Sequence, residues 1–151
     1  MAADLTILSY DPGESTGVVA LRVSPEGVKL IWSGVVLQTA PLLIPLPISE
    51  LSELTDVVVE AEPHRPDNLI GARRAQEILV VAAQQGLRSF AYAPGQWKPM
   101  AKRLILRYPG ELRTRHARDA YGMAMIHLRR LYARNFPFLL EADKPWYLPV
   151  K

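Results

Sequence analysis

The sequence has 151 residues, 49% of them hydrophobic and 22% charged, which is the size and composition of one globular domain and excludes a disordered chain. It contains no cysteine, which excludes disulfides, thiolate metal sites and cysteine nucleophiles and favours a reducing, cytoplasmic setting. No apolar run approaches the roughly 20 residues of a membrane span, and the first residues lack the pattern of a secretory signal.

The net charge of +3 conceals two segments of opposite sign. Residues 1–63 hold two basic and nine acidic side chains, a net of −7, whereas residues 88–134 hold eleven basic and two acidic ones, a net of +9. The basic segment favours a polyphosphate partner such as nucleic acid. A solvated helix face is the alternative explanation of the same charges.

The first half of the chain predicts four strands. Extended runs cover 5–8, 16–23 and 28–38, with turns of sequence DPG and SPEG between them, and such short connections give an antiparallel meander. The proline-rich stretch that follows is a connector with a short helix over 49–54. The β-branched run 56–60 is typical of a strand buried on both faces.

The second half predicts helices and one further strand. The expected elements are a helix over 69–85, a strand over 89–93, a basic helix over 96–107 and a long helix over 115–135. The tail 141–151 holds two prolines and is expected to be irregular. The order predicts a single α/β domain over 1–140, whose central five-stranded mixed sheet is flanked by helices.

Three acidic residues fall where such a fold would gather them. Asp11 ends the first strand, Glu60 ends the buried strand, and Asp119 follows His116 by three residues near the start of the last helix. If the first and fourth strands are parallel neighbours, their carboxyl ends lie at one edge of the sheet, where ligand sites of open α/β sheets are found. His116 and Asp119 share a helix face and would complete the cluster.

Crowded carboxylates and an imidazole are satisfied by Mg²⁺ or Mn²⁺. Two such ions about 3.5–4 Å apart form an arrangement that cleaves phosphodiesters without a nucleophilic side chain. Each acidic position alone has a plainer explanation, as a turn, a strand end or a charge preference at a helix start. Their joint placement at one predicted edge is what favours a metal site.

Four segments resemble, in order, the motifs of the RuvC-type Holliday-junction resolvases. They are ILSYDPGESTGVVAL (7–21), DVVVEAEPHRPDN (56–68), ARRAQEILVVAAQQGLRSFAYAPGQWK (72–98) and HARDAYGMAMIHLRR (116–130). The resemblance implies an RNase H-like fold and a Mg²⁺- or Mn²⁺-dependent endonuclease of DNA recombination and repair that nicks four-way junctions symmetrically. It also implies a homodimer formed through helix 69–85 in a bacterial or phage-infected cell. The short chain suggests a phage or otherwise divergent member.

The resemblance also assigns roles to single residues. The metal ligands are Asp11, Glu60, His116 and Asp119, and Lys98 takes the place of a lysine near the scissile phosphate. Glu62 shares the strand face of Glu60 and rivals it as the second ligand. The loop with His64, Arg65 and Pro66 stands where RuvC enzymes usually place an aromatic residue that probes the junction, so the way in which the junction is opened is not predicted.

Several further residues carry weaker expectations. The basic residues expected to contact DNA are Arg73, Arg74, Lys98, Lys102, Arg103, Arg113 and Arg115. For Arg73 and Arg74, a solvated surface position is an equal alternative. Trp97 either stacks on a base or belongs to the core, and His127, Met123 and Met125 are expected to be structural.

Two other functions stay open at this point. The chain could be another RNase H-like nuclease, acting on flaps or on RNA, which a substrate panel would reveal. It could also be a catalytically silent DNA-binding module, which a metal titration would reveal. The actin-like nucleotide-binding fold also uses an Asp-x-Gly turn, but its two domains need a longer chain.

Overall fold

The structure is a computed structural model that describes residues 4–37, 54–61, 69–141 and 145–148. Its elements, in chain order, are β1 (Leu5–Asp11), β2 (Ser15–Ser24), β3 (Gly27–Leu37), β4 (Leu54–Glu60), α1 (Leu69–Gln84), β5 (Arg88–Tyr92), α2 (Pro94–Arg103), α3 (Arg115–Tyr132) and the short 3-10 helix η2 (Pro137–Leu140). Residues 49–53 of the expected helix, Glu62 and the loop residues His64, Arg65 and Pro66 lie outside the described residues, and Leu54, the last residue of that expected helix, begins β4 instead. None of the described helices is long and apolar enough to cross a membrane.

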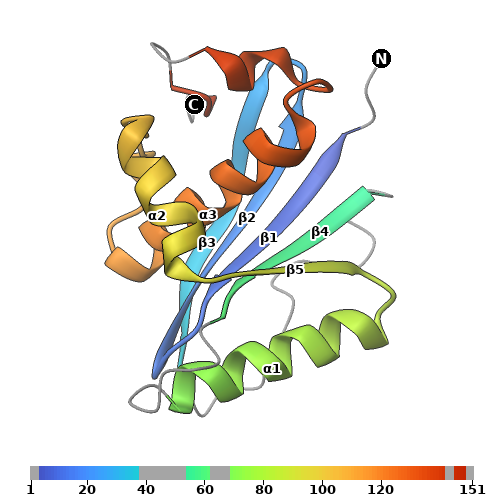
Figure 1. Cartoon of the computed structure of the whole chain (residues 1–151), viewed down its shortest axis with the longest axis vertical. Coiled ribbons are helices and arrows are strands. Elements are labelled where there is room, and N and C mark those ends of the chain that lie inside the picture. Colours follow the sequence, from blue (N-terminus) through green and yellow to red (C-terminus); the bar gives the residue numbers. More distant parts are fainter. Residues whose placement is uncertain (1–3, 38–53, 62–68, 142–144, 149–151) are drawn as a thin grey trace.

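The five strands form one mixed sheet in the order β3-β2-β1-β4-β5 (Figure 1). β1 pairs antiparallel with β2, and β2 pairs antiparallel with β3, because each pair is joined by a tight turn. β1 pairs parallel with β4, and β4 pairs parallel with β5. The mixed five-stranded sheet expected from the sequence is therefore confirmed, and β1 and β4 are parallel neighbours.

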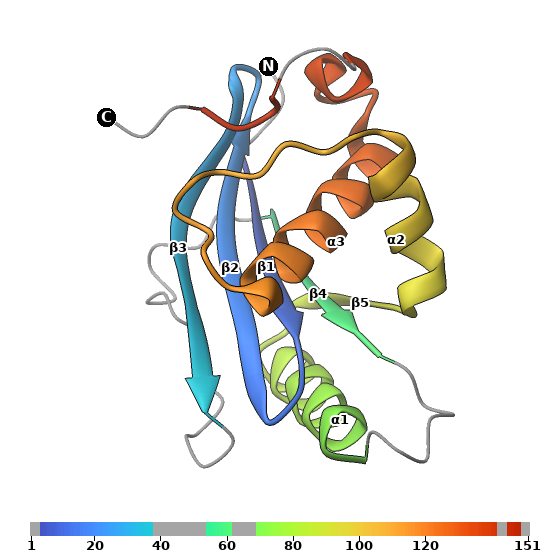
Figure 2. The same cartoon turned by 90° about the vertical axis from the view of Figure 1, so that its left-hand side faces the viewer.

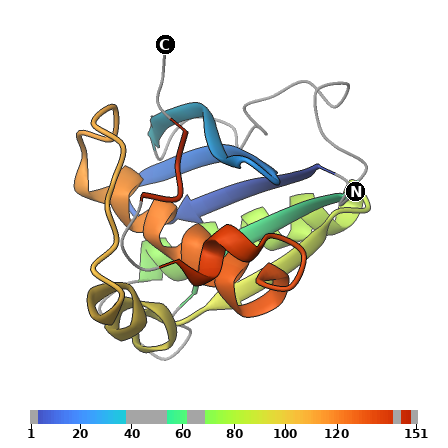
Figure 3. The same cartoon turned by 90° about the horizontal axis from the view of Figure 1, so that it is seen from above.

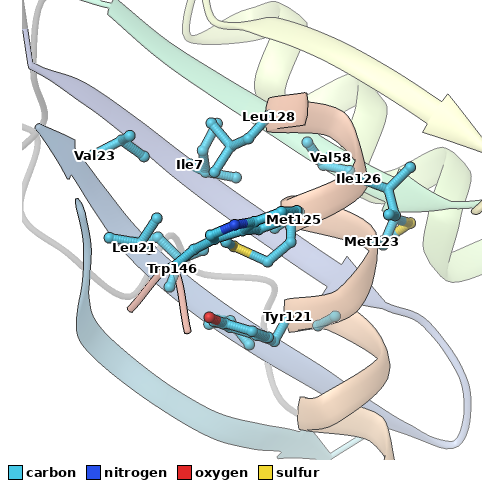
Figure 4. Packing of buried hydrophobic residues seen from close by; sticks show 14 of the residues in the cluster. Ile7, Leu21, Val23, Val58, Tyr121, Met123, Met125, Ile126, Leu128 and Trp146 are labelled. Atoms are coloured by element: carbon cyan, nitrogen blue, oxygen red, sulfur yellow. The ribbon is translucent and has the colours of Figure 1, made fainter. Parts of the chain in front are cut away.

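Helices cover both faces of the sheet, and strand alternation divides the core between them. Ile7, Leu21 and Val58 point to the face covered by α3, whereas Leu8, Val57 and Val59 point to the face covered by α1. α3 is buried over nine consecutive residues, 120–128, as expected for a helix enclosed on all sides. Figure 4 shows Met123 and Met125 within this packing, which confirms their structural role.

Residues 145–148 are more ordered than the expected irregular tail. Leu148 N donates to Val28 O at 2.7 Å, and Val28 N donates to Trp146 O at 2.9 Å, which adds a short parallel bridge beside β3. The Trp146 ring is buried in the same core cluster as α3 (Figure 4). A residue beyond the expected domain boundary at 140 therefore belongs to the core.

Helix α2 differs from the expected span of 96–107 at both ends. It begins at Pro94, whose fixed φ suits the first helical position, and the Gln96 side chain accepts a hydrogen bond from Ala93 N at 2.7 Å. It ends at Arg103 with the paired hydrogen bonds of a Schellman motif, Leu106 N to Ala101 O and Ile105 N to Lys102 O. The last helix, α3, likewise ends at Tyr132, three residues earlier than expected.

Ile105 occupies the position of the Schellman motif that is usually a glycine. Its φ is 51°, in the left-handed region, and it is the one non-glycine residue with a positive φ among those described. For an L-residue this conformation costs roughly 1–2 kcal/mol. Ile105 is also 81% exposed, so burial of its side chain does not offset the cost.

A buried polar cluster ties α3 to the far end of the sheet, where β4 begins. The Asp56 carboxylate accepts hydrogen bonds from His127 Nε2 at 2.8 Å, from the Tyr132 hydroxyl at 2.6 Å and from the Arg88 guanidinium at 2.6 Å. The Tyr92 hydroxyl meets the other ring nitrogen of His127 at 2.7 Å. Asp56 and His127 are fully buried, which agrees with the structural role expected for His127.

Candidate metal centre

The ends of β1 and β4 bring two acidic side chains to the same edge of the sheet. The parallel register pairs Tyr10 with Val59, so Asp11 and Glu60, the next residue of each strand, lie side by side. Figure 2 shows the arrowheads of both strands together, with the first turn of α3 beside them. Asp11 is buried and Glu60 is half-buried. The sequence-based expectation of two neighbouring carboxylates at this edge matches the described geometry.

One hydrogen bond caps the start of α3, and another holds the helix to β1 near this edge. Thr114 caps the helix, its side chain accepting a hydrogen bond from Ala117 N at 3.1 Å. The Ser9 hydroxyl of β1 donates to Ala120 O at 2.6 Å across the buried interface. A serine inside a strand buried along its whole length is the sequence signal of such a hydrogen-bond partner.

Gly17 of β2 allows α3 to come this close. A Cβ at this position would lie 2.4 Å from the backbone carbon of His116, a separation that real Cβ atoms do not show. With the glycine in place, His116 Nδ1 donates a hydrogen bond to Asp11 Oδ2 at 2.9 Å. Gly17 of the first motif therefore leaves room for the backbone of His116 in the last motif.

Helix α2 supplies two further side chains to the same edge, and it packs against α3 (Figure 3). Lys98 Nζ lies 3.8 Å from Asp119 Oδ2, a loose ion pair. Trp97 Nε1 donates a hydrogen bond to Glu60 Oε2 at 2.7 Å. The Trp97 ring is only 2% exposed, so the base-stacking interpretation of Trp97 is wrong. It is a core residue whose single polar atom holds Glu60.

The pKa shifts show that these side chains share one electrostatic environment. Burial raises the pKa of Asp11, and the charge of Asp119 raises it further, while the hydrogen bond from His116 opposes both. Burial and then the charge of Asp11 raise the pKa of Glu60, against the hydrogen bond from Trp97. Carboxylates whose pKa is raised by burial and by a neighbouring carboxylate are typical of functional sites and of cation sites.

The donor atoms at this edge are of the chemical type that binds a hard divalent cation. Carboxylate oxygens and an imidazole are ligands of Mg²⁺ and Mn²⁺, and Lys98 is the cation that now faces Asp119. Among the described residues, however, no three acidic or imidazole groups already surround a single point closely enough to hold an ion. Asp11 and Glu60 are instead engaged by His116 and Trp97.

The basic residues expected to contact DNA divide into two sets. Lys102, Arg103, Arg113 and Arg115 are exposed, on the last turn of α2 and on the chain that leads into α3. Arg73 is exposed on α1. Arg74 is only 7% exposed and forms an ion pair with Glu77 at 3.4 Å. Its burial corrects the expectation that Arg74 offers its charge to a phosphate.

The arrangement described here is that of an RNase H-like fold, with acidic residues at the adjoining ends of its first and fourth strands. The structure is similar to that of T. thermophilus RuvC, solved in complex with a Holliday junction substrate, with a TM-score of 0.57 and 19% sequence identity over 87% of this chain and 96% of that chain. The RuvC-like architecture expected from the sequence is therefore confirmed. The sequence itself matches no protein-family model and no curated protein.

Proposed function

We propose that this chain is a metal-dependent endonuclease of the RuvC type that resolves four-way DNA junctions. The observation that carries the proposal is the meeting of Asp11 and Glu60, at adjoining strand ends, with His116 and Asp119 from the first turns of α3. These residues are 105 or more positions apart between β1 and α3, so only the fold brings them together. The similar RuvC structure contains a Holliday junction substrate, which supports the choice of substrate.

Asp11, Glu60, His116 and Asp119 are the proposed ligands of Mg²⁺ or Mn²⁺. When bound, the ions would supply an activated water and stabilise the leaving oxygen of a phosphodiester. The other residues keep the ligands in place. Trp97 orients Glu60 through its N–H and, being buried, excludes water from one side of that carboxylate. A ligand fixed in this way by a neighbour typically binds metal about 10- to 100-fold more tightly than a free one.

Lys98 is the proposed contact to the scissile phosphate. It lies beside Asp119 while remaining partly exposed, so it can exchange its weak pairing with the carboxylate for a phosphate. The exposed Lys102 and Arg103 on the last turn of α2, and the exposed Arg113 and Arg115 just before and at the start of α3, are the further proposed contacts to the DNA backbone. A DNA backbone held by several such residues binds with strong salt dependence. Arg74 is left out of the proposed surface because it is buried.

A homodimer formed through α1 is part of the proposal. The helix covers one face of the sheet with Ala75, Ile78 and Ala82, yet it also exposes the large apolar side chains of Leu69 and Val80. These are the apolar side chains that a contact through α1 would cover. A dimer would place two metal centres on one junction, as symmetric nicking requires.

Cleavage of a panel of synthetic substrates tests the proposed function. Four-way junctions, flaps, linear duplex and RNA–DNA hybrid are incubated with the protein and Mn²⁺, with a chelator as the control. We expect paired nicks, symmetric about the branch point, in the four-way junction and little cutting of linear duplex. Intact junctions alongside efficient cutting of flaps, linear duplex or RNA would contradict the proposal and assign a different RNase H-like nuclease activity.

A further inference from the structure

A hollow of about 260 Å³ opens beside the candidate metal centre, between α2, the chain that follows it and α3. It is lined by Trp97, Lys98, Ala101, Lys102, Ile105, Leu106, Tyr108 and Asp119. Lys98 and Asp119 also belong to the candidate metal centre. A ligand in the hollow would therefore adjoin whatever phosphate that centre holds.

The lining of the hollow combines apolar, aromatic and positively charged side chains. Ile105 and Leu106 give an apolar wall, the ring of Tyr108 adds an aromatic one, and Lys98 and Lys102 give two positive charges. Single-stranded nucleic acid is bound by this combination, with the base against apolar or aromatic side chains and the phosphates near lysines. The volume is below the roughly 300 Å³ at which pockets for whole small molecules begin, which fits one nucleotide better than a length of strand.

Ile105 is the least expected residue of the lining. It takes the glycine position of a Schellman motif, with a φ of 51° and an exposed, β-branched side chain. A glycine would adopt this backbone without strain. Strained residues that packing does not explain are concentrated where a ligand is held. We therefore infer that the side chain of Ile105 contacts a ligand in the hollow rather than stabilising the fold.

We propose that this hollow holds one unstacked nucleotide of the DNA strand that is cut, next to the scissile phosphate. Ile105 contacts the base, and Lys102 lies near a flanking phosphate. The inference rests on the proposed function for the identity of the strand, but the recognition itself needs only an unstacked base and its phosphate. A branch point is where such a base is least costly to provide, because stacking is already interrupted there.

Two substitutions separate this role from a structural one. Ile105→Gly removes the side chain and relieves the backbone strain, so we expect unchanged or increased thermal stability together with about tenfold weaker binding of junction DNA. Lys102→Ala is expected to weaken binding and to reduce its salt dependence by about one charge. Leu140→Gly and Arg134→Ala are the controls, because they remove an exposed apolar side chain and an exposed positive charge outside the hollow.

The closing experiment places the fluorescent base 2-aminopurine at each position around the branch point in turn. Junctions are bound to protein that carries Asp11→Asn, so that the DNA stays intact. We expect an emission change at one position, lost when Ile105→Gly is added and retained when Leu140→Gly is added. The same emission change with and without Ile105, together with binding within about twofold, would overturn the proposal.

The outcomes for the hollow and for the proposed function are distinguishable. If the wild type cuts junctions and Ile105→Gly changes neither binding nor emission, nucleotide binding in the hollow is contradicted and the proposed nuclease function is retained. If the wild type cuts no branched DNA, yet an Ile105-dependent emission change is seen, nucleotide binding in the hollow is retained and the proposed nuclease activity is contradicted. If neither is seen, both are overturned.

Discussion

Asp11→Asn is expected to abolish junction cleavage while junction binding is retained or becomes tighter. The substitution keeps the shape of the side chain but removes a charged proposed ligand that lies beside Glu60 and is hydrogen-bonded to His116. Metal ions contribute several kcal/mol to transition-state stabilisation, so we expect a fall in the cleavage rate of at least about 1000-fold. Binding survives because the lost charge was negative and would repel a phosphate. Cleavage rates and gel-shift affinities measured side by side check both parts.

Asp4→Asn is the matched control for this experiment. Asp4 is exposed one residue before β1, so the same chemical change is made outside the candidate centre, and we expect cleavage within about twofold of the wild type. Retained turnover in Asp11→Asn would exclude the proposed carboxylate and metal mechanism. Loss of both cleavage and binding would indicate a folding defect, which circular dichroism of the variant would reveal.

Asp56→Ala is expected to cause the largest loss of stability. Asp56 is fully buried and accepts hydrogen bonds from His127, Tyr132 and Arg88. Removing one member of such a buried group leaves the others without a partner and typically costs about 3–5 kcal/mol. This is a large part of the roughly 5–15 kcal/mol that stabilises a domain. The midpoint of urea unfolding measures the effect.

Arg88→Ala is the control for this loss, because the Arg88 side chain is half exposed. Its removal leaves Asp56 with the hydrogen bonds from His127 and Tyr132, so we expect a smaller loss of stability than for Asp56→Ala. If Arg88→Ala destabilised the protein as much as Asp56→Ala, the ion pair with Arg88 rather than the buried contacts to His127 and Tyr132 would be the main contribution. Equal stability of Asp56→Ala and the wild type would contradict the role of the cluster altogether.

The contribution of Asp56 also has a predicted pH dependence. Burial alone would raise the pKa of Asp56, but the hydrogen bonds from His127, Tyr132 and Arg88 outweigh it, and the pKa is lowered. A lowered pKa stabilises the folded state above the unfolded value of about 3.9 and ceases to do so as the pH falls through the folded value. The stability difference between the wild type and Asp56→Ala should therefore be constant near neutral pH and shrink only below about pH 4.

Much of the fold could be predicted because local patterns encode it. The DPG turn ends β1 at Asp11, and the three valines before Glu60 mark a strand buried on both faces. Once those two strands are parallel neighbours, the edge that holds both acids follows from geometry alone. The approach of His116 was predicted from helical spacing, although the Gly17 contact that permits it was not.

The remaining features depend on contacts that no local pattern encodes. Trp97 reaches Glu60 across 37 positions, and His127 reaches Asp56 across 71. Both contacts are set by how a helix lies on the sheet, which side-chain shapes decide together. Burial of Arg74 and the docking of Trp146 have the same origin. The left-handed Ile105 could not be predicted because the sequence rule for that position favours glycine.

Calorimetric titration of Mn²⁺ and Mg²⁺ into the metal-free protein tests the central claim most directly, since the proposed nuclease activity depends on divalent ions held at the meeting point of β1, β4 and α3. The account predicts saturable binding by the wild type at or below millimolar ion concentrations, and much weaker binding by Asp11→Asn. Absence of ion binding at millimolar concentrations, in protein that still binds junction DNA, would contradict it and leave a DNA-binding module without nuclease chemistry.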